Sequence, residues 1–288
     1  MNIAVTGAAG NLGQGVVESL LSRGVNEKIV AITRVPEKIE SFQQRGVEVR
    51  PGDFDDPASL VKAFAGVDRL LIISTGGDNS TRIRQHQTAA LAAKEAGVGF
   101  IAYTSIANAS HNTLGLAEVH RATENAIRQT GISFSFLRNN WYLENESGYI
   151  QAALAGAPIV TSAGNGKIGW ALRTDYAQAA AAVLAGPGND NTIYELGGTL
   201  ATYEDFAAAL GQVLKKKVSV EHVDDETYGK SLAASGMPNF VVAFLVGSAH
   251  EISQGALDVA GSDLAKILGR PAVALPEALK QLVEQIKK

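Results

Sequence analysis

The chain has 288 residues, of which 46% are hydrophobic and 19% are charged, and its formal net charge is −4. This length and composition fit a globular protein with one large domain, or with a large and a smaller one, and exclude a disordered or fibrous chain. Without a basic excess, neither nucleic acid nor an anionic membrane surface is expected as the main partner, and without cysteine there is no disulfide, thiolate zinc site or thiol catalysis.

The N-terminal residues enter an apolar strand pattern directly, without the charged segment and cleavage site of a secretory signal. No apolar run approaches about 18 residues, the length that a membrane-spanning helix needs. We therefore expect a cytoplasmic protein without a membrane partner.

Short apolar runs alternate with amphipathic stretches over the first two-thirds of the chain. This alternation predicts an α/β fold, a doubly wound parallel sheet of the Rossmann type with helices on both faces. Pro36 and Pro57 stand where two of the helices would begin, and glycines close several others. The expected strands are 3–5, 29–32, 47–49, 69–73, 100–103 and 133–137, and the expected helices are 12–23, 36–45, 57–65, 80–96 and 114–130.

The regular alternation weakens after about residue 140. A segment rich in small residues, 151–169, precedes an expected helix at 174–185 and a strand at 192–196 that can extend the main sheet. Helices dominate beyond Tyr203, with one strand candidate at 218–222.

These patterns predict two parts. The first is a Rossmann domain over 1–145, to which 170–198 returns. The second is a smaller, α-rich lobe on the substrate side, made of 146–169 and 199–288. We expect this lobe to close over the carboxyl ends of the strands, where ligands of open α/β sheets bind.

Glycines spaced G-x-x-G-x-x-G lie between the first expected strand and the first expected helix. Residues without a Cβ let the backbone approach a pyrophosphate, and the free N–H groups of the helix start bind phosphate. A tight turn alone can also explain such glycines, but their place at the start of a βαβ unit favours a dinucleotide. The predicted contacts are Gly7, Ala8, Ala9, Gly10, Asn11, Leu12 and Gly13.

Arg34 follows the second expected strand, at the position where an acidic residue would hold the ribose 2′-hydroxyl of NAD. A guanidinium there suits the 2′-phosphate of NADP through paired, charge-assisted hydrogen bonds. The sequence therefore predicts NADPH as the cofactor and an NADP-binding role for the Rossmann domain. The alternative is a solvated surface arginine that pairs with Glu37.

Polar residues follow the next two expected strands. Asp53 is expected to border the adenine, and Ser74, Thr75 and Gly76 to lie along the ribose or the nicotinamide, although each also fits an ordinary turn. None of the five histidines is spaced from another histidine or from carboxylates as metal ligands are, so we predict no metal site.

Several stretches together resemble a known family: 4–13 with Arg34, then 103–105, 116–124 and 137–145, and finally 173–176 and 263–269. They are similar to the NmrA-like family of atypical short-chain dehydrogenases/reductases. Within it, the similarity is to the bacterial type 2 NADPH:quinone oxidoreductases and also to the triphenylmethane dye reductases. The resemblance extends over nearly the whole chain.

The resemblance implies that NADPH is held by the glycine loop, by Arg34 and 74–76, and by four further residues. It also implies a quinone or a similar planar hydride acceptor, with Trp141 and Tyr142 beside it. Independently, a Trp-Tyr pair after a strand offers flat apolar faces to a planar ring, although core packing explains the pair equally well. The four further residues are Asn139, Asn140, Glu144 and Arg173.

The sequence differs from the wider reductase superfamily at one catalytic motif. Reductases of the wider superfamily carry Tyr-x-x-x-Lys, in which the tyrosine donates a proton. His120 at the lysine position places Leu116 at the tyrosine position, so this donor is absent. Since histidine ordinarily titrates near neutral pH, His120 is a candidate to hold a ribose hydroxyl or relay a proton; the alternative is a helix-surface histidine.

We therefore predict an oxidoreductase that transfers a hydride from NADPH to a quinone without flavin or metal, with His120, Trp141 and Tyr142 as catalytic-site residues. One alternative is a triphenylmethane-dye-type reductase. Another is an NmrA-like regulatory protein that senses NADP(H). The aromatic pair favours an enzyme, because a sensor needs no aromatic substrate pocket.

Overall fold

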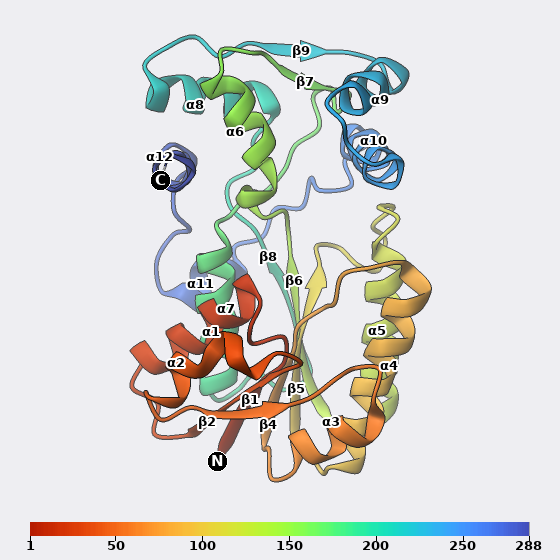
Figure 1. The fold of residues 1–288 in the computed structure, drawn as a ribbon, viewed down its shortest axis with the longest axis vertical. Coiled ribbons are helices and arrows are strands. Elements are labelled where there is room, and N and C mark those ends of the chain that lie inside the picture. The colour runs from red at the N-terminus through yellow and green to blue at the C-terminus, as the bar shows by residue number, and fades with distance from the viewer. Residues whose placement is uncertain (288) are drawn as a thin grey trace.

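The computed structural model describes residues 1–287 and contains a seven-stranded parallel sheet in the order β3-β2-β1-β4-β5-β6-β8 (Figure 1). The strand order reverses between β1 and β4, and this switch point opens a crevice at the carboxyl ends of the strands. The predicted doubly wound fold is confirmed. The strands are β1 (Asn2–Val5), β2 (Lys28–Thr33), β3 (Glu48–Pro51), β4 (Arg69–Ile72), β5 (Phe100–Ile106), β6 (Ser133–Asn139) and β8 (Thr192–Leu196).

Helices cover both faces of this sheet, which explains why its central strands are apolar on both sides. On β1, Ile3 and Val5 pack with the first group of helices, whereas Ala4 between them packs with the second group. The first group is α1 (Asn11–Ser22), α2 (Glu40–Gln43), α7 (Arg173–Ala185) and α11 (Asp263–Leu268). The second group is α3 (Pro57–Phe64), α4 (Asn79–Glu95) and α5 (Ala117–Thr130).

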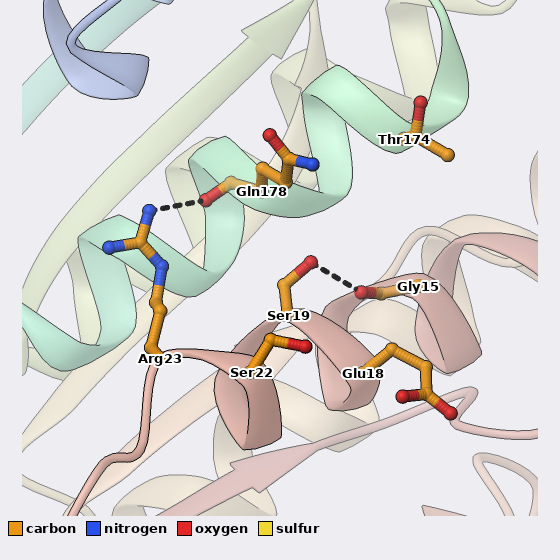
Figure 2. Close-up of a pocket in the computed structure, with 7 residues that line it drawn as sticks. All are labelled: Gly15, Glu18, Ser19, Ser22, Arg23, Thr174 and Gln178. Carbon is orange, nitrogen blue, oxygen red and sulfur yellow. Dashed lines mark hydrogen bonds between the residues drawn. The ribbon is translucent and has the colours of Figure 1, made fainter.

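Helices α1 and α7 pack closely because Gly15 faces Ala177: a Cβ added at Gly15 would lie 3.0 Å from the Ala177 Cβ. Figure 2 shows a groove of about 480 Å³ between the two helices. The Ser19 hydroxyl there donates to the Gly15 carbonyl (2.7 Å), and the Arg23 guanidinium donates to the Gln178 carbonyl (3.5 Å). The first of these bonds lies within α1, and the second joins the end of α1 to α7.

The expected elements agree with the observed ones within a few residues, with two differences. The expected helix 36–45 divides into the 3-10 turn η1 (Pro36–Ile39) and the short α2. The segment rich in small residues contains an unforeseen strand, β7 (Ile159–Thr161), which pairs in parallel with β9 (Val220–His222).

The remaining elements gather beyond the carboxyl ends of the strands (Figure 1). Their core is a separate cluster of buried side chains that includes Trp170, Tyr203 and Phe206. Helix α11 packs on α7 and β8 of the Rossmann part, although the sequence pattern assigns its residues to the smaller lobe. The predicted domain boundaries stay a prediction. The elements are η2 (Leu143–Glu146), α6 (Ser147–Leu154), α8 (Tyr203–Leu214), α9 (Asp225–Ala234), α10 (Asn239–Ser253) and α12 (Leu275–Ile286). In the described part of the chain, no helix has the length and apolarity to cross a membrane.

A buried ion network ties the strand ends together beneath this lobe. Arg138 of β6 donates to the Glu124 carboxylate of α5 through Nε (2.9 Å) and Nη2 (2.8 Å), and to Glu195 of β8 through Nη1 (3.1 Å). The Ser105 hydroxyl of β5 also donates to Glu124 (2.7 Å). Four elements thus depend on one buried guanidinium–carboxylate pair.

We predict that Arg138→Met lowers the free energy of unfolding by about 3–5 kcal/mol, because Glu124 is left buried without its cation. The matched control is Arg128→Met: Arg128 lies 3.6 Å from the same carboxylate, but its side chain is 39% exposed. Its loss should cost about 1 kcal/mol or less. Urea unfolding followed by circular dichroism measures both, and equal losses would contradict this account.

Candidate functional site

A cavity of about 1120 Å³ lies between the carboxyl ends of the strands and the smaller lobe. The sheet contributes the loop after β1 and the ends of β4, β5 and β6. The lobe contributes side chains of α6, α9 and α10, including Tyr149, Tyr228 and Phe244. Most of the residues predicted for the site line this one space.

The loop after β1 fits a pyrophosphate. Gly7 has a φ of +60°, a conformation that favours glycine, and a Cβ at Gly13 would lie 2.3 Å from the Gly7 carbonyl oxygen. No side chain among residues 1–287 caps α1 after Gly10, so its first N–H groups are available to a phosphate. The loop residues on the cavity wall are Gly7, Gly10, Asn11, Leu12 and Gly13, whereas Ala8 and Ala9 pack on the core.

Arg34 lies one residue beyond β2 and is exposed, outside the wall of the cavity. It forms no ion pair with Glu37 or with any other carboxylate of the described chain. Asp53 is half-buried outside the cavity, and its carboxylate accepts from the Asp55 N–H (3.0 Å), as in an ordinary turn. The role of both in cofactor binding stays a prediction.

Ser74 and Thr75 line the cavity after β4, and Gly76 lies exposed outside it. The Thr75 N–H donates to Nε2 of His86 (2.9 Å), so the ring proton of His86 is on Nδ1, where it faces the Thr123 hydroxyl (2.8 Å). Burial, aided by the charge of Arg82, lowers the pKa of His86 to about 3. This neutral histidine fixes the chain after β4.

Arg82 is a functional candidate that the sequence did not indicate. It lines the cavity and donates through Nη2 to the Ser74 hydroxyl (2.9 Å), while its Nε is buried without a hydrogen-bond partner in the described chain. Burial lowers its pKa, and no carboxylate of residues 1–287 lies within ion-pair distance of it. A cation at this edge suits an anionic ligand. In the sequence, Arg82 is visible only as an arginine near the start of an expected helix, and this position alone does not indicate a ligand-binding role.

His120 is buried, with 5% of its surface exposed, and lines the cavity, so the surface alternative is wrong. Burial, together with Arg82 and His86, lowers its pKa well below the ordinary value. The expectation that it titrates near neutral pH is therefore also wrong. Its Nδ1 lies 2.8 Å from the hydroxyl of the fully buried Tyr103, and Leu116 lines the cavity close by without a donor group.

The residues at the end of β6 and just after it line the cavity, and some of them also hold neighbouring loops in place. Asn139 donates to the Tyr142 hydroxyl (3.0 Å), whereas Asn140 holds loops: its side chain accepts from the Trp141 N–H (2.8 Å) and donates to the Leu257 carbonyl (3.1 Å). All four, Asn139, Asn140, Trp141 and Tyr142, line the cavity.

Arg173 also lines the cavity, with its guanidinium 5.5 Å from the centre of the Tyr142 ring. Glu144 does not. Its carboxylate accepts from the Arg173 N–H (2.9 Å) and thereby satisfies the start of α7. The structure thus gives Glu144 a local supporting contact, and its predicted contact with the cofactor stays a prediction.

The lobe side of the cavity carries polar groups that the sequence did not indicate. The Tyr149 and Tyr228 hydroxyls lie 2.7 Å apart. Glu146 is 4% exposed, and its Oε1 accepts from the Trp170 indole N–H (3.0 Å) and the Tyr203 hydroxyl (3.3 Å). Burial raises the pKa of Glu146 to about 7. No sequence pattern distinguishes this buried acid from its neighbour Glu144.

The site therefore joins a phosphate-binding loop and a buried cation to a compartment of aromatic and aliphatic side chains. This arrangement suits a dinucleotide beside a planar, largely apolar molecule. Among residues 1–287, no three His, Asp or Glu side chains gather as metal ligands would.

The chain is similar to known proteins over nearly its whole length. The sequence is 39% identical to Quinone oxidoreductase 2 of Escherichia coli K12, over 97% of this chain and 98% of the relative. The structure of an NADPH-dependent quinone oxidoreductase from Escherichia coli in complex with NADPH has a TM-score of 0.93 at 38% identity, covering 97% of this chain and 99% of the other. Triphenylmethane reductase of Citrobacter sp. in complex with NADP(H) has a TM-score of 0.93 at 40% identity, covering 98% and 100%. Because the NmrA-like family profile also matches residues 1–261, the chain belongs to the NmrA-like family.

Proposed function

We propose that this protein is an NADPH-dependent oxidoreductase that reduces a quinone or a similar planar acceptor. The observation that carries the proposal is that the glycine loop and an aromatic compartment open into the same cavity. An NADPH-dependent quinone oxidoreductase with the same fold over nearly the whole chain supports it. We also propose that it works in the cytoplasm, as predicted from the sequence.

The residues on the sheet side are placed to hold the cofactor. Gly10 and Gly13 admit the pyrophosphate to the start of α1, and Arg34 suits the 2′-phosphate at the edge of the sheet. Ser74 and Asn139 line the cavity toward the strand ends, where the nicotinamide ribose would lie. NADPH bound there would supply the hydride.

The acceptor side favours a quinone over an ordinary ketone. A ketone that gains a hydride becomes a strongly basic alkoxide, which reductases usually protonate or hydrogen-bond in the transition state. Leu116 does neither. A quinone becomes a hydroquinone anion whose charge spreads over an aromatic ring, so it needs no donor beside the carbonyl near Leu116, and walls such as Trp141 can position the ring for hydride transfer.

A triphenylmethane-dye-type reductase is the second candidate, because the Citrobacter sp. enzyme is as similar in fold. Such dyes are cations whose trigonal central carbon also accepts a hydride and needs no proton. An NADP(H) sensor explains the phosphate-binding loop but not the aromatic compartment. A substrate panel separates the three.

We predict that Arg34→Ala weakens NADPH binding about ten- to a hundredfold, because a charge-assisted contact worth about 1.5–3 kcal/mol is lost. NADH, which has no 2′-phosphate, should bind almost unchanged. Calorimetric titration of both cofactors measures the ratio. Equal binding of NADPH and NADH by the wild type would refute the assignment.

We predict that Gly10→Val abolishes dinucleotide binding in a protein that still folds. Its Cβ would lie 3.2 Å from the Gly7 carbonyl oxygen, a tight contact that a small shift relieves, but the side chain would occupy the phosphate approach. Gly13→Ala should instead lower the melting temperature, since its Cβ would lie 2.7 Å from the Ala8 Cα. If Gly10→Val kept its affinity in calorimetry, the phosphate site would lie elsewhere.

We predict turnover of quinones, and of cationic triphenylmethane dyes, with negligible activity on simple ketones and aldehydes. His120→Ala should lower quinone turnover only modestly, because burial keeps the histidine neutral and no proton transfer from it is required. The assay follows NADPH absorbance over a substrate panel, corrected for the uncatalysed reaction. Brisk ketone reduction, or complete loss of quinone turnover without His120, would show that this account of the site is wrong.

A further inference from the structure

We infer that Glu146 is the general acid that protonates the acceptor from the lobe side of the cavity, an inference that rests on the proposed function. The residue ends η2, the short turn that follows the Trp141-Tyr142 pair. Its side chain is almost fully buried yet forms part of the cavity wall. The carboxyl is therefore shielded from bulk water and accessible to a bound ligand.

The hydrogen bonds of Glu146 leave one oxygen for that ligand. Oε1 accepts from the Trp170 indole N–H (3.0 Å) and from the Tyr203 hydroxyl (3.3 Å). Among residues 1–287, Oε2 accepts no hydrogen bond of this geometry, although the side chain of Trp141, which also lines the cavity, interacts with the carboxyl and favours its charged form. Trp170 and Tyr203 thus hold the carboxyl by Oε1, and Oε2 takes no part in these two hydrogen bonds.

No positive charge compensates Glu146. Within the described chain, no Lys, Arg or His lies within ion-pair distance of it. The titratable groups that face it are Tyr149 of α6, Tyr203 of α8 and Tyr228 of α9, and burial raises the pKa of each, so all three stay neutral. An isolated carboxylate is costly in such surroundings, which favour the protonated acid.

Structural need does not explain a carboxyl here. The Trp170 N–H and Tyr203 hydroxyl need only an acceptor, and a neutral amide oxygen would satisfy them without the cost of a buried ionisable group. Burial raises the pKa of Glu146 to about 7, although interactions with Trp170, Tyr203 and Trp141 oppose the shift. An acid with such a pKa near the working pH is suited to proton transfer.

The shape of a quinone explains why the acid lies on this side. A 1,4-quinone carries two carbonyl oxygens across one ring, so an acceptor near Leu116 at one end can direct its second oxygen toward the lobe. In the proposed step the acceptor gains the hydride and, at its second oxygen, the proton of the Glu146 carboxyl. The hydrogen that arrived as hydride then moves from the ring carbon to the first oxygen by tautomerisation, so that one hydride and one proton convert the quinone into a hydroquinone and NADPH into NADP⁺.

Because a hydride and one proton complete a two-electron reduction, the proton that Glu146 gives is the only one that the net reaction consumes. The Glu146 carboxylate regains its proton from water. A simple ketone has no second oxygen to reach this acid. The position of Glu146 therefore agrees with the predicted preference for quinones.

The test compares wild type with Glu146→Gln in single-turnover reduction of menadione by NADPH between pH 5.5 and 9. The wild-type rate should fall as the pH rises through about 7, where Glu146 loses its proton. Glu146→Gln should be about a hundredfold slower at pH 6, which is the lower end of the rate enhancement that a positioned acid contributes. Its rate should also lack this fall with rising pH, which is the alkaline limb of the wild-type pH–rate profile. The two rates should converge toward pH 9.

Tyr203→Phe provides an independent variant that keeps the acid. It removes a hydrogen bond that favours the carboxylate, so the limb should move to higher pH. Glu204→Gln is the matched control: its carboxylate lies in the same lobe with a side chain that is 60% exposed, and the limb should not move.

Stability supplies a readout that does not depend on turnover. Because the folded pKa of Glu146 lies above its ordinary value of 4.5, the native state loses stability as the pH rises from 4.5 through about 7. The melting temperature of Glu146→Gln relative to wild type should therefore be higher at pH 8 than at pH 5.

An unchanged limb in Glu146→Gln or Tyr203→Phe would overturn the inference. Absence of menadione reduction by the wild type at every pH would instead refute the proposed function, and the inference with it.

Discussion

The approach of α1 to the end of β1 is the constraint on which the rest of the site depends. A Cβ at Gly13 would lie 2.3 Å from the Gly7 carbonyl oxygen, so the helix starts directly at the carboxyl edge of the sheet only because this side chain is missing. That start directs unpaired N–H groups into the crevice where the strand order reverses. Every other group of the cavity is positioned relative to this phosphate-binding edge.

The distribution of charge follows from the same edge. The sheet side carries the helix N-terminus and Arg82, whose buried guanidinium lacks a carboxylate partner in the described chain. The lobe side carries Glu146, an acid with no cation within ion-pair distance among residues 1–287. In contrast, Arg138 and Glu124 neutralise each other directly beneath the cavity. Among residues 1–287, the structure pairs its buried charges where they only support the fold and leaves ionisable groups without an opposite charge around the cavity, which is a pattern typical of functional sites.

Local signals explain what could be predicted from the sequence. Strands, helices and the glycine loop are encoded by residues that are close in the chain, and so is the cation at Arg34. Burial is not local. Burial beneath side chains of other elements lowers the pKa of His120 on its helix and raises the pKa of Glu146, two residues after Glu144. Strand β7 was missed because its three residues are stabilised by pairing with β9, about sixty residues away.

The central claim is that a hydride passes directly from the dinucleotide to a planar acceptor within one cavity. The most direct measurement is single-turnover reduction of menadione by flavin-free protein, using NADPH that carries deuterium or hydrogen at the transferable position of the nicotinamide. The account predicts reduction without added flavin and a slower rate with deuterium. Reduction that requires flavin, or equal rates with the two isotopes, would contradict it.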